Sequence, residues 1–212
     1  AARTLEEVEA AAAALAAEGG SAEALRLNVT DLPRMQETLA GLPAFDVLVN
    51  NAGTNKPSGF LEVSVENFDL VMSINVRAAY FVAQAVAQGM AAAGRGGSII
   101  HISSQMGHVG GARRSIYCAS KWAMEGFSKA MAIDLAPHRI RVNTLAPTFI
   151  QTPMTRPFFE DETFRASVLS KIKLGRIGEV EDLMGAIVFL ASDASALMTG
   201  SSLVVDGGWT AE

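Results

Sequence analysis

Short apolar runs alternate with longer amphipathic stretches along the chain. Compact runs rich in branched residues predict β-strands at 24–29, 45–49, 98–102, 140–145 and 203–205. Between them, apolar residues recur at spacings of three and four, which predicts helices before Gly19 and at 31–40, 66–93, 115–137, 161–171 and 179–191. Thr4 with Glu7 has the pattern of a capping box, Thr30 or Asp31 precedes the second helix, and Ser115 is the expected N-cap of the helix at 115–137.

This alternation predicts an α/β fold. Strands that are separated by helices of about ten residues or more pair in parallel, and the helices then cover both faces of the sheet. We therefore expect a doubly wound, Rossmann-like sheet in a three-layer α/β/α arrangement. The chain of 212 residues, 50% of them hydrophobic, suits one domain with a large core, and the irregular, proline-containing segment 151–178 reads as an insertion within it.

Composition narrows the possible partners and the cellular location. A net charge of -5 and a pI near 5.3 give no basic footprint for nucleic acid. Cys118 is the single cysteine, so an internal disulfide is excluded and a reducing, cytoplasmic compartment is expected. The alanine-rich start carries Glu6, Glu7 and Glu9, which is not the pattern of a signal peptide. No uninterrupted apolar run approaches the roughly 18 residues of a membrane span, and no His/Cys cluster has metal-ligand spacing.

Polar residues follow three of the predicted strands at the point where each strand ends. Asn50 and Asn51 follow the strand at 45–49, Ser103 and Ser104 follow the strand at 98–102, and the segment 147–152 follows the strand at 140–145. In a parallel sheet the carboxyl ends of the strands lie at one edge, where ligands bind. We expect these polar residues to form one site.

Tyr117 and Lys121 carry the most distinctive chemistry. Residues four apart on a helix share one face. A free tyrosine, with a pKa near ~10, is a poor acid or base at neutral pH, and a cation at ~4 Å favours the phenolate by up to ~4 kcal/mol at an effective dielectric constant of ~20. Lys121 is thus expected to lower the pKa of Tyr117 into the working range, although the pair taken alone fits an ordinary surface helix equally well.

Upstream residues turn this pair into a family pattern. The motif Asn50-Asn51-Ala52-Gly53, with Asn75 and Ser104 at 42 and 13 residues before Tyr117, resembles the short-chain dehydrogenase/reductase family in its compact single-domain branch. The resemblance extends from end to end of the chain through 141–143, 147, 152–154, 199–200 and 204–208. It implies reversible hydride transfer between a nicotinamide and a secondary alcohol or ketone.

The resemblance also implies roles for individual residues. Tyr117 would exchange a proton with the substrate oxygen, Ser104 would hydrogen-bond that oxygen, Lys121 would support Tyr117 and the nicotinamide ribose, and Asn75 would anchor a relay water. The implied cofactor-binding positions are Arg3, Asn28, Val29, Asn51, Ala52, Gly53, Tyr117, Lys121, Pro147, Ile150 and Thr152. Both NADP and NAD are possible cofactors. NADP is weakly favoured, because Arg3 lies at the position where family members that select NADP place a cation for the 2′-phosphate.

Substrate and assembly are less constrained. Gln105, His108, Phe158 and Phe159 are the expected pocket residues, and 151–178 is the expected substrate lid. The substrate could be a sugar, a polyol or a 3-oxoacyl thioester, and Arg113, Arg114 and Arg156 leave an anionic substrate open. Small residues on the helices at 66–93 and 115–137 suit close packing between subunits, and the family resemblance implies a homotetramer or a dimer.

One part of the family pattern has no counterpart in the sequence. The family opens with a strand, a glycine-rich turn and a helix, and we expect such a unit of ~30 residues or more ahead of Ala1, since it supplies the phosphate cradle and the central strand. This gap motivates one alternative, a non-catalytic nucleotide-sensing member of the fold, although such a sensor has no need of Tyr117 and Lys121. A sugar-nucleotide epimerase, which can share the Tyr-x-x-x-Lys motif, is a further alternative.

Overall fold

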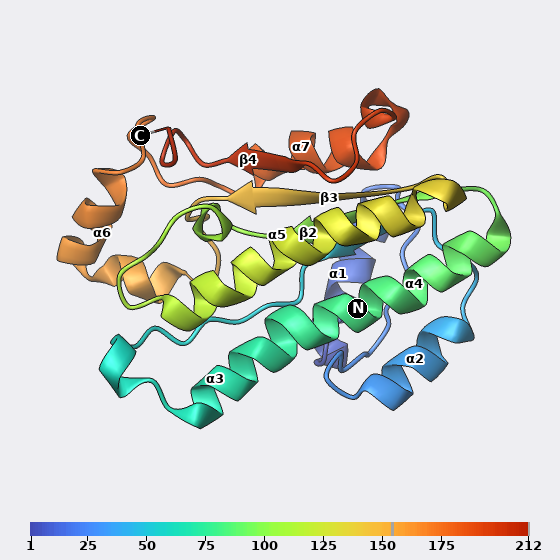
Figure 1. Ribbon diagram of the computed structural model, residues 1–212, viewed down its shortest axis with the longest axis horizontal. Helices are drawn as coiled ribbons and strands as arrows, with labels where there is room; N and C mark the ends of the chain where they lie inside the picture. The colour runs from blue at the N-terminus through green and yellow to red at the C-terminus, as the bar shows by residue number, and fades with distance from the viewer. Residues whose placement is uncertain (154, 212) are drawn as a thin grey trace.

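The computed structural model describes residues 1–153 and 155–211. A four-stranded parallel sheet lies at its centre, in the order β1 (Val47–Asn50), β2 (Gly97–Ile102), β3 (Ile140–Pro147) and β4 (Ser202–Val205). The register pairs Val47 with Ser98, Ser98 with Arg141 and Thr144 with Ser202. The strands all point the same way, so their carboxyl ends meet at one edge (Figure 1).

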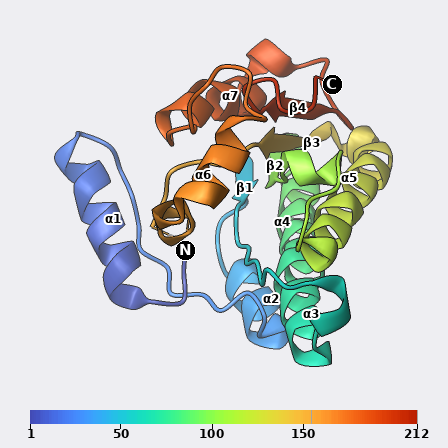
Figure 2. The ribbon, with the colours of Figure 1, turned by 90° about the vertical axis from the view of Figure 1, so that its left-hand side faces the viewer.

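Helices cover both faces of this sheet, which confirms the predicted α/β class. On one face lie α2 (Leu32–Ala40), α3 (Val65–Met72), α4 (Ala79–Ala93) and α5 (Ser115–Leu135), and on the other lies α7 (Glu181–Ala191), as Figures 1 and 2 show. The core on the first face joins Met90 of α4 and Ala132 of α5 to Ile99 and Val142 of the sheet. On the second face Leu190 of α7 packs on Ile100 and Leu145. Apolar burial of this kind, at ~25 cal/mol per Å², holds the layers together.

The predicted long helix at 66–93 is continuous but irregular. α3 and α4 are joined by a π-helical segment, Ser73–Ala78, whose wider turn contains the buried Asn75. By length and composition Val65–Ala93 could cross a membrane, but Val82, Val86 and Met90 are buried inside this chain, as in the core helix of a globular protein.

Several local predictions were wrong. The segment 24–29 forms no extended strand, because its pairing is limited to the bridge between Ala2 and Arg26. Thr4 precedes α1 (Leu5–Ala17) without a side-chain capping bond, and Arg114 rather than Ser115 is the N-cap residue of α5. Asp31 does cap α2, since its carboxylate accepts a hydrogen bond from the Arg34 amide.

The segment 151–178 contains a 3₁₀ turn, Arg156–Glu160, and the short helix α6 (Glu162–Leu169). Phe149 packs against Phe159, Phe164 and Trp209, with ring centres 5.7–6.0 Å apart. This aromatic cluster holds the segment beside the carboxyl ends of β2 and β3, next to the cavity described below. Of the family-like motif at 152–154, Met154 lies outside the described residues.

Candidate active site

A cavity of about 750 Å³ lies at the carboxyl ends of β1, β2 and β3. Its volume falls within the ~300–1,000 Å³ typical of small-molecule sites. Most of the polar clusters predicted from the sequence meet here. The lining includes Asn51, Gly53, Ser104, Gln105, Arg114, Tyr117, Lys121, Pro147, Ile150, Thr152 and Phe158.

The helix α5 places Tyr117 and Lys121 on the same wall of the cavity. The Lys121 ammonium lies 5.6 Å from the centre of the Tyr117 ring and donates a hydrogen bond of 2.7 Å to the Ile102 carbonyl. Burial lowers the pKa of Lys121 to about 8, while the nearby Glu125 carboxylate acts in the opposite direction. A lysine with a pKa in this range can be either charged or neutral under mildly alkaline conditions.

The environment of Tyr117 differs from the sequence expectation. Burial raises the pKa of Tyr117, and the Ser104 hydroxyl and the Arg114 guanidinium oppose this rise. We expected Lys121 to be the cation that lowers this pKa, but its ammonium is directed to the Ile102 carbonyl. Ser104 itself donates to the Gln105 side-chain oxygen at 2.7 Å and accepts from the Met106 amide at 3.1 Å.

Asn75 connects three parts of the site through its side-chain amide. Its Nδ2 donates to the Thr54 carbonyl at 2.9 Å and to the Ser120 hydroxyl at 3.0 Å, and its Oδ1 accepts from the Thr54 amide at 2.8 Å. These bonds hold the loop after β1 against α5. The π-helical turn around Asn75 brings this otherwise helix-disfavouring residue into a fully buried position.

Glu125, which sequence reasoning missed, lies buried one helical turn beyond Lys121. Its carboxylate accepts hydrogen bonds from the Thr144 hydroxyl at 2.8 Å and the Ser202 hydroxyl at 3.3 Å. His108 Nε2 lies 3.4 Å from the same carboxylate and 3.0 Å from Ser202 Oγ. His108 was expected in the substrate pocket, but this polar pairing draws it away from the cavity lining. The signal in the sequence was the spacing of four between Lys121 and Glu125.

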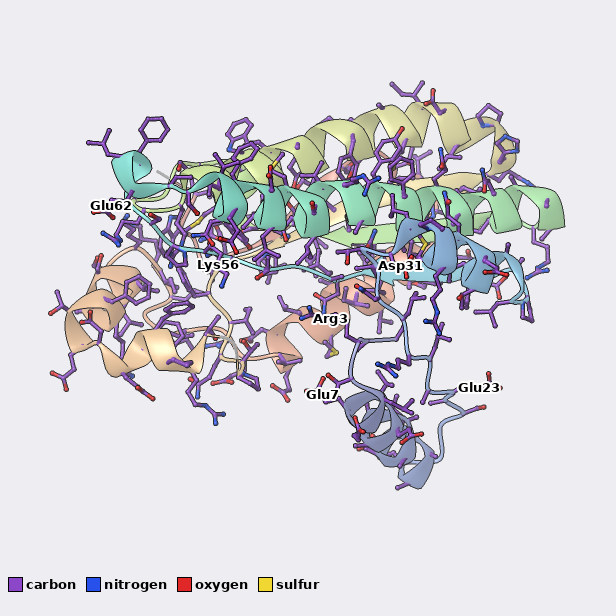
Figure 3. The ribbon with its side chains drawn as sticks, turned by 90° about the horizontal axis from the view of Figure 1, so that it is seen from below. Arg3, Glu7, Glu23, Asp31, Lys56 and Glu62 are labelled. Carbon is purple, nitrogen blue, oxygen red and sulfur yellow. The ribbon has the colours of Figure 1, made fainter. Side chains whose placement is uncertain are left out.

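The predicted cofactor residues separate into two groups. Asn51, Gly53, Pro147, Ile150 and Thr152 line the cavity together with Tyr117 and Lys121, whereas Ala52 belongs to the same loop without lining it. The others, namely Arg3, Asn28 and Val29, lie elsewhere. Figure 3 shows Arg3 near the start of α1, where its carbonyl accepts from Arg26 Nε at 3.2 Å. The Asn28 oxygen is occupied by the Thr30 amide and hydroxyl.

The cavity wall also contains buried polar atoms that have no hydrogen-bond partner in the described part of the chain. They are Asn55 Oδ1, Ser103 Oγ and Thr148 Oγ1. Buried polar atoms in native proteins are normally paired, so unpaired ones at a cavity indicate a place for a polar ligand or water. Together with the glycine-containing Asn51 loop, this wall fits the nicotinamide and ribose end of a dinucleotide.

Gln105, Arg114 and Phe158 also contribute to the lining of the cavity. Phe159 was expected there too, but it stacks on Phe164 and packs edge-on against Phe149 instead. The guanidinium of Arg114 lies over the Phe158 ring, 5.7 Å from its centre. Of the expected pocket residues, Gln105 and Phe158 thus line the cavity, whereas Phe159 does not.

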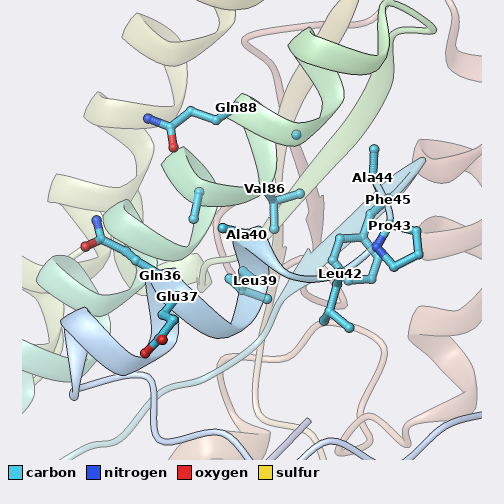
Figure 4. Close-up of a pocket in the computed structure, with 12 residues that line it drawn as sticks. Gln36, Glu37, Leu39, Ala40, Leu42, Pro43, Ala44, Phe45, Val86 and Gln88 are labelled. Atoms are coloured by element: carbon cyan, nitrogen blue, oxygen red, sulfur yellow. The ribbon is translucent and has the colours of Figure 1, made fainter.

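A second hollow, of about 460 Å³, lies between α2 and α4 (Figure 4). Glu37 is the one titratable side chain among the described residues that line it. This hollow therefore lacks the acid–base pair of the larger cavity. Within residues 1–153 and 155–211 no group of three His, Cys, Asp or Glu side chains could hold a metal ion.

Known proteins share this arrangement. A family model described as enoyl-(acyl carrier protein) reductase matches residues 2–210. L-xylulose reductase of Bos taurus is 40% identical over 189 residues, 89% of this chain and 78% of that protein. The 2-dehydro-3-deoxy-D-gluconate 5-dehydrogenase of Escherichia coli (strain K12) is 41% identical over 177 residues, 84% and 70% of the two chains. The crystal structure of a gluconate 5-dehydrogenase from Burkholderia cenocepacia J2315, with NADP and tartrate, has a TM-score of 0.94 at 32% identity and covers 99% of this chain and 84% of that one.

A Rossmann-like sheet with serine, tyrosine and lysine at its carboxyl edge defines a nucleotide-dependent oxidoreductase. The chain belongs to the short-chain dehydrogenase/reductase family, as its motifs predicted.

Proposed function

We propose that this protein interconverts a secondary alcohol and a ketone on a sugar or polyol, using NADP(H) or NAD(H). The observation that carries the proposal is the placement of Ser104, Tyr117 and Lys121 on the wall of one cavity. The names of the relatives support the substrate class, because they are a ketose reductase and dehydrogenases of sugar acids.

In this proposal each side chain has one task. Tyr117 delivers a proton to the carbonyl oxygen during reduction and removes it during oxidation. The Ser104 hydroxyl hydrogen-bonds the same oxygen and stabilises the charge that develops on it. Lys121 adds positive charge beside the Tyr117 ring, and Asn75 fixes the loop and helix that flank the site. Without these groups, neither a proton donor nor a hydrogen bond would stabilise the alkoxide that forms in this poorly solvated cavity.

The bound nicotinamide would supply the hydride, and Asn51, Gly53, Lys121, Ile150 and Thr152 would hold its end of the cofactor. The neighbouring structure with NADP supports NADP as the preferred form. The Arg26 side chain donates to the Arg3 carbonyl near the start of α1, and the cationic side chains of Arg3 and Arg26 would favour a 2′-phosphate there.

The segment 151–178 would act as the substrate lid, because its Phe158 contributes to the cavity wall and its aromatic cluster packs beside it. Closure of such a segment excludes water from the reacting groups. We further propose a cytoplasmic, homo-oligomeric enzyme, a tetramer or a dimer. The single cysteine supports the cytoplasmic location. Apolar side chains such as Trp122 and Ile133, which are exposed on α5, support the association of subunits.

The test is a spectrophotometric screen of ketoses and polyols with both nicotinamides, for wild type and Tyr117→Phe. We expect turnover by wild type and a loss of at least ~10²-fold in kcat for Tyr117→Phe, because the proton donor is removed. The control is Cys118→Ala, which changes the adjacent residue and should retain full activity.

Binding of cofactor, measured by calorimetry on the same three proteins, separates catalysis from binding. Tyr117→Phe should bind cofactor about as well as wild type. Cofactor binding without turnover of any ketose or polyol would instead support a nucleotide sensor and refute the proposed reaction.

A further inference from the structure

Arg114 is a buried residue whose guanidinium has no ion-pair or hydrogen-bond partner among the described residues. The residue is 7% exposed, and it contributes to the wall of the cavity. Within the described residues no carboxylate forms an ion pair with it, and no side-chain hydrogen bond leaves its guanidinium. A guanidinium has five N–H donors, and those of Arg114 can donate to a ligand in the cavity that it lines.

Other arginines of this chain show how such a group is ordinarily satisfied. Arg141 donates to the Leu190 carbonyl at 2.8 Å and to the Ser195 hydroxyl at 2.8 Å, and it has further carbonyl acceptors. Arg176 is paired bidentately with Asp182. Arg114 has neither kind of acceptor, so its donors are free for a molecule in the cavity.

The guanidinium is nevertheless held in place. Phe158 lies under its plane at 5.7 Å, a cation–π contact that fixes the group without using its N–H donors. Arg114 is also the N-cap residue of α5, and no side chain caps this helix. The 21-residue helix therefore begins at the backbone of Arg114, and the positive end of its dipole also favours an anion.

We propose that Arg114 binds the carboxylate of the substrate, so that the preferred substrate is an acidic ketose or the matching polyhydroxy acid rather than a neutral sugar. This inference rests on the proposed function and refines it, because the relatives include both kinds of substrate. Arg114 lies one helical turn before Tyr117. A carboxylate on the guanidinium thus orients the remainder of the molecule relative to the proton donor.

The charge of the cavity fits one carboxylate. No acidic side chain is among the described residues that line it, and its cations are Arg114 and Lys121. The Lys121 ammonium already has the Ile102 carbonyl as its acceptor. One free guanidinium matches the two oxygens of a carboxylate in a bidentate contact.

The experiment compares two ketoses that differ at one end only. The probes are 5-keto-D-gluconate and L-sorbose, which have the same ketone and stereocentres but carry a carboxylate and a hydroxymethyl group, respectively, at the far end. For wild type we expect a higher kcat/KM with the acid. In Arg114→Gln the ratio of kcat/KM for acid over neutral ketose should fall by about tenfold or more, since charged hydrogen bonds are lost.

Two variants calibrate this result. Arg114→Lys keeps the charge but loses the bidentate geometry, and should retain part of the preference. Arg113→Asn removes the neighbouring, exposed charge and should leave the ratio as in wild type. Equal ratios in wild type and Arg114→Gln, or a wild-type preference for L-sorbose, would overturn the inference while leaving the oxidoreductase function in place. An equal fall for both ketoses would likewise overturn it, since Arg114 would then support Tyr117 rather than read the carboxylate.

Binding without turnover gives an independent readout. With NADP present, D-gluconate should raise the Tm of wild type more than D-glucitol does, and the difference should vanish in Arg114→Gln. If no ketose is turned over, the proposed function fails, and this binding comparison still decides whether Arg114 recognises a carboxylate.

Discussion

The Lys121 ammonium donates a hydrogen bond of 2.7 Å to the backbone carbonyl of Ile102. This contact connects α5 to the carboxyl end of β2, so the position of Lys121 beside Tyr117 is set by the sheet. The charge state of Lys121 then depends on burial and on Glu125.

Replacement of Glu125 by Gln should shift the alkaline limb of the pH–activity profile to lower pH. The pKa of Lys121 is about 8, and the Glu125 carboxylate holds it above the value that burial alone would give. Without that charge Lys121 loses its proton at lower pH, so reductase activity that needs the ammonium should decline at lower pH than in wild type. The measurement is kcat/KM against pH. Glu125→Asp, which keeps the charge, is the control, and an unmoved limb in Glu125→Gln would contradict the coupling.

Replacement of His101 by Leu should make the protein more resistant to acid. Burial, with the charge of Lys121 in addition, lowers the pKa of His101 from 6.5 to about 4. Between these values the unfolded chain binds a proton that the folded chain does not, so wild type loses on the order of 3 kcal/mol of unfolding free energy as the pH falls. Neither ring nitrogen of His101 has a hydrogen-bond partner among the described residues, so Leu should not destabilise the protein at neutral pH.

Urea unfolding at pH 7 and pH 4.5 measures this difference. We expect the loss of unfolding free energy between the two pH values to be smaller in His101→Leu than in wild type. His138→Leu, at a position near the end of α5, should behave like wild type. Parallel curves for wild type and His101→Leu would show that His101 does not contribute to acid sensitivity.

Replacement of Asn75 by Ala should destabilise the fold by roughly 2–4 kcal/mol. The variant loses bonds to both backbone groups of Thr54 and to the Ser120 hydroxyl, all in a buried place. Ser120→Ala removes one of these bonds and should cost only about 1 kcal/mol. Denaturant unfolding gives both values, and equal losses in the two variants would show that the Thr54 contacts contribute nothing.

Replacement of Trp122 by Glu should weaken subunit association. Trp122 is 54% exposed on α5, and Ile133, three turns further on, is 76% exposed. A charge on such an apolar face disfavours burial against another copy. Light scattering after size exclusion should show a smaller species than wild type. Lys129→Glu also changes the charge of α5, and an equal effect of both variants would argue against an apolar contact.

The features that could be predicted from the sequence depend on local patterns of residues or on the shared carboxyl edge of the parallel sheet. The runs at 98–102 and 140–145 were correctly predicted as strands, because their residues pack on both faces of the sheet. The run at 45–49 was also correctly predicted, although its strand is Val47–Asn50 and Val47 and Val49 are exposed on one face. The polar residues after them came together because parallel strands end at one edge. The segment 24–29 has the composition of a strand but forms none, because a strand also requires a partner strand along its length.

Sequence could not place the side chains whose position depends on distant residues. His108 lies near Tyr117 in sequence, but Ser202 and Glu125 decide where its ring lies. Phe159 is adjacent to Phe158, yet successive residues of a 3₁₀ turn point in different directions, so one reaches the cavity and the other the aromatic cluster. The proposed binding of a carboxylate by Arg114 depends on the lack of a hydrogen-bond acceptor for its guanidinium among the described residues. No sequence pattern reveals such a lack.

The π-helical turn Ser73–Ala78 adds one residue to the chain. Such a turn contains one residue more than an α-helical turn, while α3 and α4 on either side keep their own packed faces. Removal of a single residue here would therefore leave a regular helix of the same span, with the core intact. The extra residue is thus dispensable for folding of the helix, and its use lies in bringing the Asn75 amide within reach of Thr54 and Ser120.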